Sequence, residues 1–306
     1  MDLRTYLERK YSPATVKAYH FEIQHYLAWM GAEVAPRATY SEVLQYLEYL
    51  RSRYDNPATL NRILATIKQY YQYLIDTGQR EDHPCASIRI RDRGRQEVQL
   101  QDLLSKAELK LLLQRNERYE ILTLRNQVIM SLLVYQALLS GEICRLNLKD
   151  VDTTAGTIFI KAGGKTNERT LPLKAEQILL LHRYIQEIRP QLIKAPSDSP
   201  TGERKETDAL IITSRGTAER GEGIHYLVTT FRKLVPNKRL TTVTIRQSVI
   251  ALMLKAGTDL RIVQTFAGHT KPSTTERYRV DHLEELREAV AKYHPLGNRS
   301  SSEGAP

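Results

Sequence analysis

The sequence predicts a mainly helical protein of two domains, with a small β-hairpin in the second domain. Apolar residues recur every three or four positions through most of residues 1–82 and again after about residue 104, which is the period of amphipathic helices. Residues 83–103 lack this rhythm. Two short β-prone runs, 157–160 and 170–173, flank a glycine-containing turn, and this pattern is typical of a hairpin. A chain of 306 residues is long enough to fill two separate cores.

The first domain is expected over residues 1–88, as helices separated by short polar turns. Ser12 followed by Pro13 marks a helix start, because serine caps the first amides and proline suits the first helical position. Asn56 followed by Pro57 marks another start, and that helix stops at Gly78. Three apolar stripes have helical spacing: Val16, Tyr19, Ile23, Tyr26, Leu27 and Met30; Val43, Leu44, Tyr46, Leu47 and Leu50; Leu60, Ile63, Leu64, Ile67, Tyr70, Tyr71 and Leu74.

Tyrosines are frequent in this first domain, and two interpretations of them are open. Either they fill a small helical core, or a few of them donate hydrogen bonds to phosphates from its rim. The residues concerned are Tyr19, Tyr26, Tyr46, Tyr49, Tyr54, Tyr70, Tyr71 and Tyr73.

A basic linker is expected over residues 89–103. Arginines stand at alternate positions in it, so an extended chain would present all four on one side. Such a row suits contacts with the phosphate backbone of DNA, which position a protein without reading sequence. The alternative is a solvated linker with no partner. The four residues are Arg89, Arg91, Arg93 and Arg95.

The second domain is expected over residues 104–294. Ser105 and Glu108 have the spacing of a capping box and predict its first helix. Further helices are expected up to Leu113 and over residues 128–146, 176–189, 224–234, 242–256, 259–267 and 274–293, with the hairpin at 157–173 and a surface loop at 194–208. The Ser- and Gly-rich tail, residues 295–306, is expected to be disordered.

Charge and composition narrow the class of partner. The net charge is +10 and the isoelectric point about 9.5, which suits a polyanion such as nucleic acid. No long apolar run or N-terminal signal segment is visible, so a membrane partner is not expected. The two cysteines, Cys85 and Cys144, have neither metal-ligand nor disulfide spacing. A reducing, cytoplasmic location follows from their scarcity.

The most informative segment is residues 267–278, which read AGHTKPSTTERY. Ser273 and Glu276 have capping-box spacing, so a helix is expected to start near Ser273. Tyr278 would then lie in the first two turns, where free amides and the helix dipole favour phosphate. A tyrosine in that place can attack a phosphodiester, with His269 within reach.

This segment resembles the C-terminal signature of the tyrosine recombinases, the integrase family. The resemblance extends over residues 1–294 and implies a helical, SAM-like core-binding domain followed by an α+β catalytic domain. It implies DNA cleavage and rejoining through a 3′-phosphotyrosine at Tyr278, with no metal or nucleotide cofactor. Arg246 and His269 match the family's phosphate-binding positions.

Two positions depart from the family pattern. The first arginine normally precedes a glutamate by three residues, and here that position is Leu139, before Glu142. Gln136 lies one turn earlier and could face the site, but it lacks charge, whereas Arg145 lies about 240° further round a helix. The histidine that normally precedes Arg246 by three residues is Val243.

The hairpin lysine that protonates the leaving sugar oxygen in this family is also displaced. Its usual position is Gly164, and Lys165 lies one residue later. A turn shorter by one residue lets Lys165 act as the acid; Lys161 is the poorer candidate, and a solvated hairpin lysine is the alternative.

The sequence therefore predicts a double-stranded DNA partner and a recombinase whose activity is weak or depends on another subunit. That subunit is either a second copy of the chain or another recombinase. A catalytically degenerate accessory protein that recognises a recombination site is the alternative. The amphipathic stretch 283–293 either docks onto a neighbouring protomer or packs on its own domain.

Overall fold

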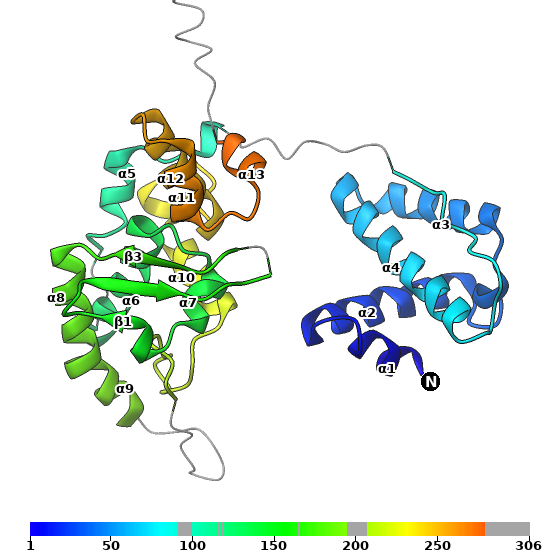
Figure 1. Cartoon of the computed structure of the whole chain (residues 1–306), viewed down its shortest axis with the longest axis horizontal. Coiled ribbons are helices and arrows are strands. Elements are labelled where there is room, and N and C mark those ends of the chain that lie inside the picture. The colour runs from blue at the N-terminus through cyan, green and yellow to red at the C-terminus, as the bar shows by residue number, and fades with distance from the viewer. Residues whose placement is uncertain (91–99, 116, 118, 165, 195–206, 279–306) are drawn as a thin grey trace, which may run out of the picture. The chain divides into compact units, whose positions relative to one another are not determined.

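The structure is a computed structural model in which residues 1–90, 100–115, 117, 119–164, 166–194 and 207–278 are described. The chain divides into two compact units, Met1–Glu97 and Val98–Pro306 (Figure 1). The division falls inside the predicted linker. The predicted disordered tail and the predicted helix beyond residue 278 lie outside the described residues.

Unit 1 is entirely helical over its described residues, as the sequence predicts. Its elements are α1 (Leu3–Glu8), α2 (Pro13–Met30), the 3₁₀ turn η1 (Ala35–Arg37), α3 (Tyr40–Arg53) and α4 (Pro57–Asp76). The predicted starts of α2 and α4 are confirmed, with the Ser12 hydroxyl accepting from the Thr15 amide and the Asn56 side chain accepting from the Ala58 amide. A capping box at the start of α3 was not predicted.

Tyrosines occupy much of the unit 1 core. Tyr26 and Tyr71 are fully buried, and their hydroxyl oxygens lie 2.5 Å apart. The Tyr71 hydroxyl also donates to the Ala35 carbonyl at 2.9 Å. Tyr6, Tyr46 and Tyr70 are buried beside them. Core packing therefore accounts for most of the tyrosines, and of those considered from the sequence Tyr54 is exposed.

Unit 2 combines helices with a three-stranded antiparallel sheet (Figure 1). Its helical elements are η2 (Leu100–Asp102), α5 (Lys106–Leu111), α6 (Glu120–Tyr135), α7 (Ser140–Arg145), η3 (Leu148–Asp150), α8 (Ala175–Arg183), the π-helical η4 (Tyr184–Ile188), α9 (Arg189–Lys194), α10 (Gly221–Thr230), η5 (Arg232–Leu234), α11 (Thr242–Lys255), α12 (Leu260–Ala267) and α13 (Pro272–Glu276). The strands are β1 (Val151–Asp152), β2 (Thr157–Ile160) and β3 (Arg169–Pro172), in the order β1-β2-β3.

The predicted hairpin is confirmed. Strands β2 and β3 pair antiparallel, with Ile158 opposite Leu171 and Ile160 opposite Arg169. Ile158, Ile160 and Leu171 are buried, and Thr170 is exposed. This alternation is that of a strand pair with one face on the core. The predicted capping box at Ser105 and Glu108 is present at the start of α5.

The start of α13 differs from the prediction. The helix begins at Pro272, with Lys271 as its N-cap and no side-chain capping bond. Proline fixes its own backbone in a helical conformation and needs no amide partner at the first position, so it sets the start. Ser273 therefore lies within the first turn and caps nothing.

The placement of Tyr278 changes as a result. Helix α13 ends at Glu276, so Tyr278 follows its C-terminal end, and the Tyr278 amide donates to the Thr275 carbonyl at 3.0 Å. The predicted proximity to the N-terminal amides and positive dipole end of a helix is wrong. The N-terminal end of α13 therefore does not attract phosphate to this tyrosine.

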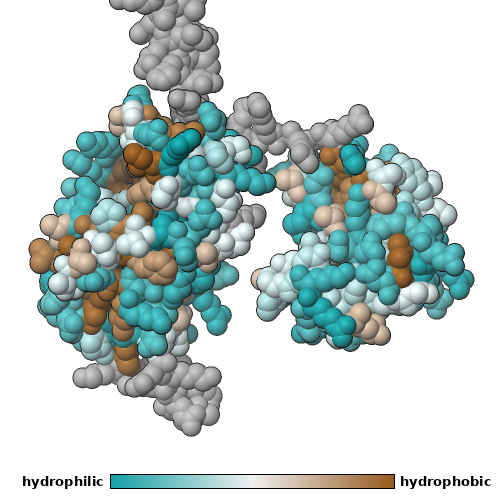
Figure 2. Space-filling model, in the orientation of Figure 1, coloured by the Kyte–Doolittle hydropathy of each residue, from teal (hydrophilic) through white to brown (hydrophobic). Residues whose placement is uncertain are grey.

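The surface in view is mostly hydrophilic over both units (Figure 2). Within the described residues, no helix is both long enough and apolar enough to cross a membrane. The core of unit 2 is continuous and draws on α6, α8, α10, α11 and the sheet. A small satellite cluster of Ile250, Val263 and Ala267 joins α11 to α12, and Tyr278 packs against it.

Candidate DNA-cleavage site

A buried ion pair lies at the centre of the candidate site. Arg169 on β3 binds Glu142 on α7 with two nearly parallel hydrogen bonds of 2.8 and 3.1 Å, and both side chains are almost fully buried. The second oxygen of Glu142 also accepts from the Leu139 amide at 2.9 Å. Burial raises the pKa of Glu142, but its hydrogen bonds to Arg169 and the Leu139 amide and the positive charges of Arg169 and Arg246 together hold the pKa below its ordinary value. Glu142 is therefore a fixed negative charge.

Arg246 on α11 joins this pair to the C-terminal loop. Its Nη1 donates to the Ala137 carbonyl at 2.6 Å and lies 3.8 Å from Glu142 Oε2. Its Nη2 donates to the Ala267 carbonyl at 2.5 Å. Burial lowers the pKa of Arg246, and the negative charge of Glu142 opposes that shift. The guanidinium is thus held in one orientation by two segments that are distant in sequence.

His269 lies in the loop between α12 and α13 and is buried. Its Nδ1 is 2.9 Å from the Thr275 hydroxyl. Its backbone forms an antiparallel bridge with Thr166 of the hairpin, and the neighbouring Gly268 carbonyl accepts from the Asn167 amide at 2.8 Å. The imidazole is therefore anchored both to α13 and to the hairpin.

Tyr278 stacks on His269. The ring centroids are 6.0 Å apart and the planes are inclined by 17°. The tyrosine is half-buried, in contact with the satellite cluster of α11 and α12. Arg246, His269 and Tyr278 thus meet where α12 ends. Arg246 binds the carbonyl of Ala267, the last residue of α12, which lies two residues before His269.

Electrostatics keep His269 neutral. Burial, together with the positive charges of Arg246 and Arg169, lowers its pKa to about 4. At neutral pH the imidazole carries a single proton, whose position on the ring is coupled to the Thr275 hydroxyl. It can donate one hydrogen bond or accept one at its free nitrogen.

The two departures from the family pattern lie on the N-terminal turns of two helices. Leu139 is the N-cap residue of α7 and is half-buried. Val243 lies in the first turn of α11 and is 49% exposed. Gln136, considered above as a residue facing the site, is instead buried, and its side chain pairs with Gln177 in two hydrogen bonds of 2.8 and 2.9 Å.

The hairpin supplies the lysine candidates. Lys165 lies outside the described residues. The turn that contains it is closed by hydrogen bonds between Gly163 and Thr166. Lys161 forms an ion pair with Asp150 at 3.0 Å, which engages its ammonium group. The Arg145 guanidinium packs against the same turn, since a Cβ on Gly163 would lie 2.9 Å from its Nη2.

The basic row of the linker is described only at its start. Arg89 is exposed, and Arg91, Arg93 and Arg95 lie outside the described residues. The row therefore stays a prediction.

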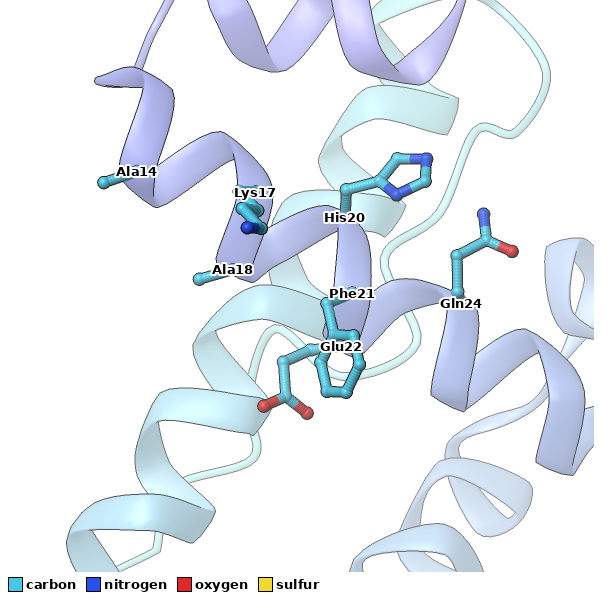
Figure 3. A pocket seen from close by; sticks show the side chains of 7 residues that line it. All are labelled: Ala14, Lys17, Ala18, His20, Phe21, Glu22 and Gln24. Atoms are coloured by element: carbon cyan, nitrogen blue, oxygen red, sulfur yellow. The ribbon is translucent and has the colours of Figure 1, made fainter. Parts of the chain in front are cut away.

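A surface hollow in unit 1 is unrelated to these groups (Figure 3). Its lining comes from one helix, α2, and Phe21 in it is 60% exposed. Side chains of a single helix do not enclose a small molecule, so the hollow is not a cofactor pocket. The lining residues are Ala14, Lys17, Ala18, His20, Phe21, Glu22 and Gln24.

Comparison with known proteins follows the same division of the chain. Residues 3–78 match the N-terminal SAM-like domain of phage integrases, and residues 102–285 match the phage integrase family itself. The chain belongs to the phage integrase family of tyrosine recombinases. The predicted family and two-domain fold class are confirmed.

Relatives within the family align over almost the whole chain. Tyrosine recombinase XerC of Oceanobacillus iheyensis is 28% identical and covers 97% of this chain and 95% of its own length. Tyrosine recombinase XerD of the same organism is 27% identical, and the alignment covers 94% of this chain and 95% of the relative.

Solved structures share the fold. XerH recombinase bound to its difH substrate superposes with a TM-score of 0.68 at 20% identity, over 90% of this chain and 79% of that chain. A chain of a lambda integrase tetramer bound to a Holliday junction superposes with a TM-score of 0.65 at 15% identity, over 90% of this chain and 74% of that chain. At these identities the likeness establishes the architecture alone.

Sequence reasoning did not assign a role to Arg169, Thr275 or His225. Nothing in the spacing of Arg169 shows that it neutralises Glu142. Thr275 is completely buried beside His269, and the pair of threonines before Tyr278 was the available signal. His225 belongs to no family motif, although its ring lies against the first residues of two helices of the site.

Proposed function

We propose that this protein carries out site-specific DNA recombination, cutting and rejoining strands through a 3′-phosphotyrosine at Tyr278. The observation that carries the proposal is the stacking of Tyr278 on a buried, neutral His269, whose loop is bonded to the Arg246 guanidinium. Few structural roles require a half-exposed phenol beside an imidazole and a preoriented arginine. The family to which the chain belongs supports the same chemistry.

Each residue has a distinct proposed role. The Tyr278 oxygen attacks phosphorus and forms the covalent bond to the 3′ phosphate, while the 5′ sugar oxygen leaves. Arg246 and His269 donate hydrogen bonds to the phosphate oxygens as negative charge builds up. Lys165 gives a proton to the leaving oxygen. Arg169 and Glu142 touch no substrate; they hold the loop and the Arg246 guanidinium in place.

The proposed partners are inferred from the net charge of the chain and from the family to which it belongs. With a net charge of +10 the protein suits double-stranded DNA, and we propose that Arg89 and the arginines after it bind the phosphate backbone. Strand exchange needs more than one active site on DNA, so a homo-oligomer or a hetero-oligomer with another recombinase is proposed. XerH and lambda integrase, which share the fold, are seen with DNA substrates. A cytoplasmic location is proposed on the same grounds.

Activity is proposed to be weak or dependent on a partner subunit. Leu139 and Val243 replace an arginine and a histidine that would face the phosphate. Loss of one preorganised donor costs about 10²–10³ in rate, and a half-exposed valine offers no donor in compensation. Binding of DNA needs only positive charge and is expected to persist.

The test is covalent capture on a nicked DNA substrate. A binding site is first selected from random duplexes with the purified protein, and a nick near the site's centre then traps the cleaved strand by releasing a short fragment. We expect a denaturation-resistant protein–DNA adduct that is absent in Tyr278→Phe. Specific binding without any adduct, alone or with a partner recombinase, would instead support an accessory role.

Restoring the missing groups provides a second test. Leu139→Arg is expected to raise the rate of adduct formation by at least tenfold, because it returns a cation to the N-cap of α7, beside Glu142. Phe21→Arg, which adds a cation on the exposed face of α2, is the control for added charge alone. Equal rates for Leu139→Arg and Phe21→Arg would contradict the placement of Leu139 at the phosphate.

A further inference from the structure

His225 on α10 bridges the starts of the two helices that frame the site. Its Nε2 lies 3.3 Å from the Ser140 hydroxyl on α7, and its Nδ1 lies 3.1 Å from the Thr242 hydroxyl on α11. Ser140 directly follows Leu139, and Thr242 directly precedes Val243. The imidazole therefore stands between the two positions at which the expected phosphate-binding groups are missing.

The packing of α10 fixes this position. Ile224, Leu227 and Val228 are buried in the unit 2 core, and His225, the residue after Ile224, is exposed at the edge of the buried stripe. The start of α10 comes close to α7, because a Cβ on Gly221 would lie 3.9 Å from the Ser140 hydroxyl. The buried side of α10 thus keeps the backbone of His225 close to α7.

Arg246 binds the same stretch of chain. Its guanidinium donates to the Ala137 carbonyl, three residues before Ser140, and lies near Glu142, two residues after it. His225 and Arg246 therefore contact the same short segment, residues 137–142.

The contacts of His225 suit a group that changes hydrogen-bond partners. Both ring nitrogens face hydroxyls, and a hydroxyl can donate or accept. The two hydroxyls can therefore pair with either neutral tautomer of the ring, or with the imidazolium, and no buried group is left unpaired. A purely structural histidine would be expected to have at least one partner of fixed polarity, such as a backbone carbonyl.

We propose that His225 binds the scissile phosphate and supplies the imidazole that Val243 lacks. This inference rests on the proposed function. One ring nitrogen exchanges its hydroxyl partner for a phosphate oxygen when DNA binds, while the other hydroxyl holds the ring in place. The catalytic histidine is thereby contributed by α10 rather than α11.

The kinetic test compares variants on the selected, nicked DNA. His225→Ala is expected to form the Tyr278 adduct about 10²–10³ times more slowly, with its affinity for DNA and its unfolding temperature nearly unchanged. His182→Ala, which removes an exposed histidine of α8, is the matched control and should react at the parental rate.

Rescue separates a contact with phosphate from a supporting role. In the His225→Ala background, Val243→His should recover the rate to within about tenfold of the parent, because the imidazole returns to the same phosphate from the neighbouring helix. A parental rate for His225→Ala overturns the proposal. So does a loss that Val243→His does not recover, since that loss marks a structural role.

A measurement without cleavage keeps the inference distinct from the proposed function. In Tyr278→Phe protein, the ¹⁵N resonances of the His225 ring, assigned through His225→Gln, should move when the selected DNA is added. Movement without any adduct in the parent protein would reject the proposed strand cleavage and retain His225 as a phosphate ligand. Unmoved resonances in a DNA-saturated sample reject His225.

Discussion

The buried imidazole of His269 should make unit 2 sensitive to mild acid. Its pKa is lowered to about 4 in the folded protein, against about 6.5 in the unfolded chain. Between these values the unfolded chain binds a proton that the folded chain does not bind. Stability is therefore complete above pH 6.5 and falls as the pH falls toward 4. Replacing His269 with glutamine, which keeps a partner for the Thr275 hydroxyl, should remove this dependence.

The size of the effect follows from the two pKa values. At pH 7.5 both states are neutral and His269 contributes almost nothing to the pH dependence. At pH 5 the unfolded imidazole is almost fully protonated and the folded one is mostly neutral, which corresponds to a loss of about 2 kcal/mol. The carboxylate of Glu142 stays ionised over this range because its folded pKa lies below its ordinary value.

Urea unfolding of the full chain at several pH values measures this loss. The protein contains one tryptophan, Trp29 on α2, so its fluorescence follows unit 1 alone. Far-ultraviolet circular dichroism follows the helices of both units, and the transition that fluorescence does not share belongs to unit 2. The separation is needed because burial also lowers the pKa of His83 in unit 1.

We expect the parent to lose about 2 kcal/mol of unit 2 stability between pH 7.5 and pH 5, and His269→Gln to lose less than about a quarter of that amount. Parallel pH profiles for the two proteins would show that His269 is protonated in the folded state or exposed to solvent. A neutral, hydrogen-bonding role for His269 would then be refuted.

Three further predictions concern the framework of the site, each measured by the same urea unfolding. Gly268→Ala should cost clearly more than Gly257→Ala. Both glycines have a left-handed backbone, in which an alanine costs about 1–2 kcal/mol. At Gly268 the added Cβ would also lie 2.6 Å from Arg169 Nη1, whereas at Gly257 nothing lies within 4 Å. Equal losses of stability for the two variants would contradict this packing at Gly268. Arg169→Met should destabilise unit 2 by about 3–5 kcal/mol by stranding Glu142, and adding Glu142→Gln should recover part of that. Ala137→Gly should stabilise unit 2 by about 0.5–1 kcal/mol, because Ala137 has a φ of 50°, a left-handed conformation that strains alanine but not glycine. A loss of stability in this variant would count against backbone strain at Ala137.

Local sequence signals predicted most of the secondary structure because they act over a single helical turn. Ser12 and Ser105 cap helices through bonds to amides three residues on, and such bonds are visible in the sequence. The predicted start of α13 was wrong because two local signals competed. The fixed backbone of Pro272 outweighed the spacing of Ser273 and Glu276.

The candidate site was only partly predictable, because its geometry depends on contacts between distant segments. Tyr278, His269 and Arg246 were recognisable from family motifs. The pairing of Glu142 with Arg169 spans 27 residues, and the contacts of His225 span 85 and 17 residues. No periodicity or spacing rule reports such contacts, so they required coordinates.

The backbone bridge between Thr166 and His269, with the Asn167 amide on the Gly268 carbonyl, has a mechanical consequence. It makes the turn of the hairpin and the loop carrying the imidazole one continuous ribbon of main chain. A displacement of that turn would therefore be transmitted through these hydrogen bonds to His269, and from there to the ring of Tyr278 stacked on it. If Tyr278 is the nucleophile we propose, contacts of DNA with the hairpin would influence its alignment.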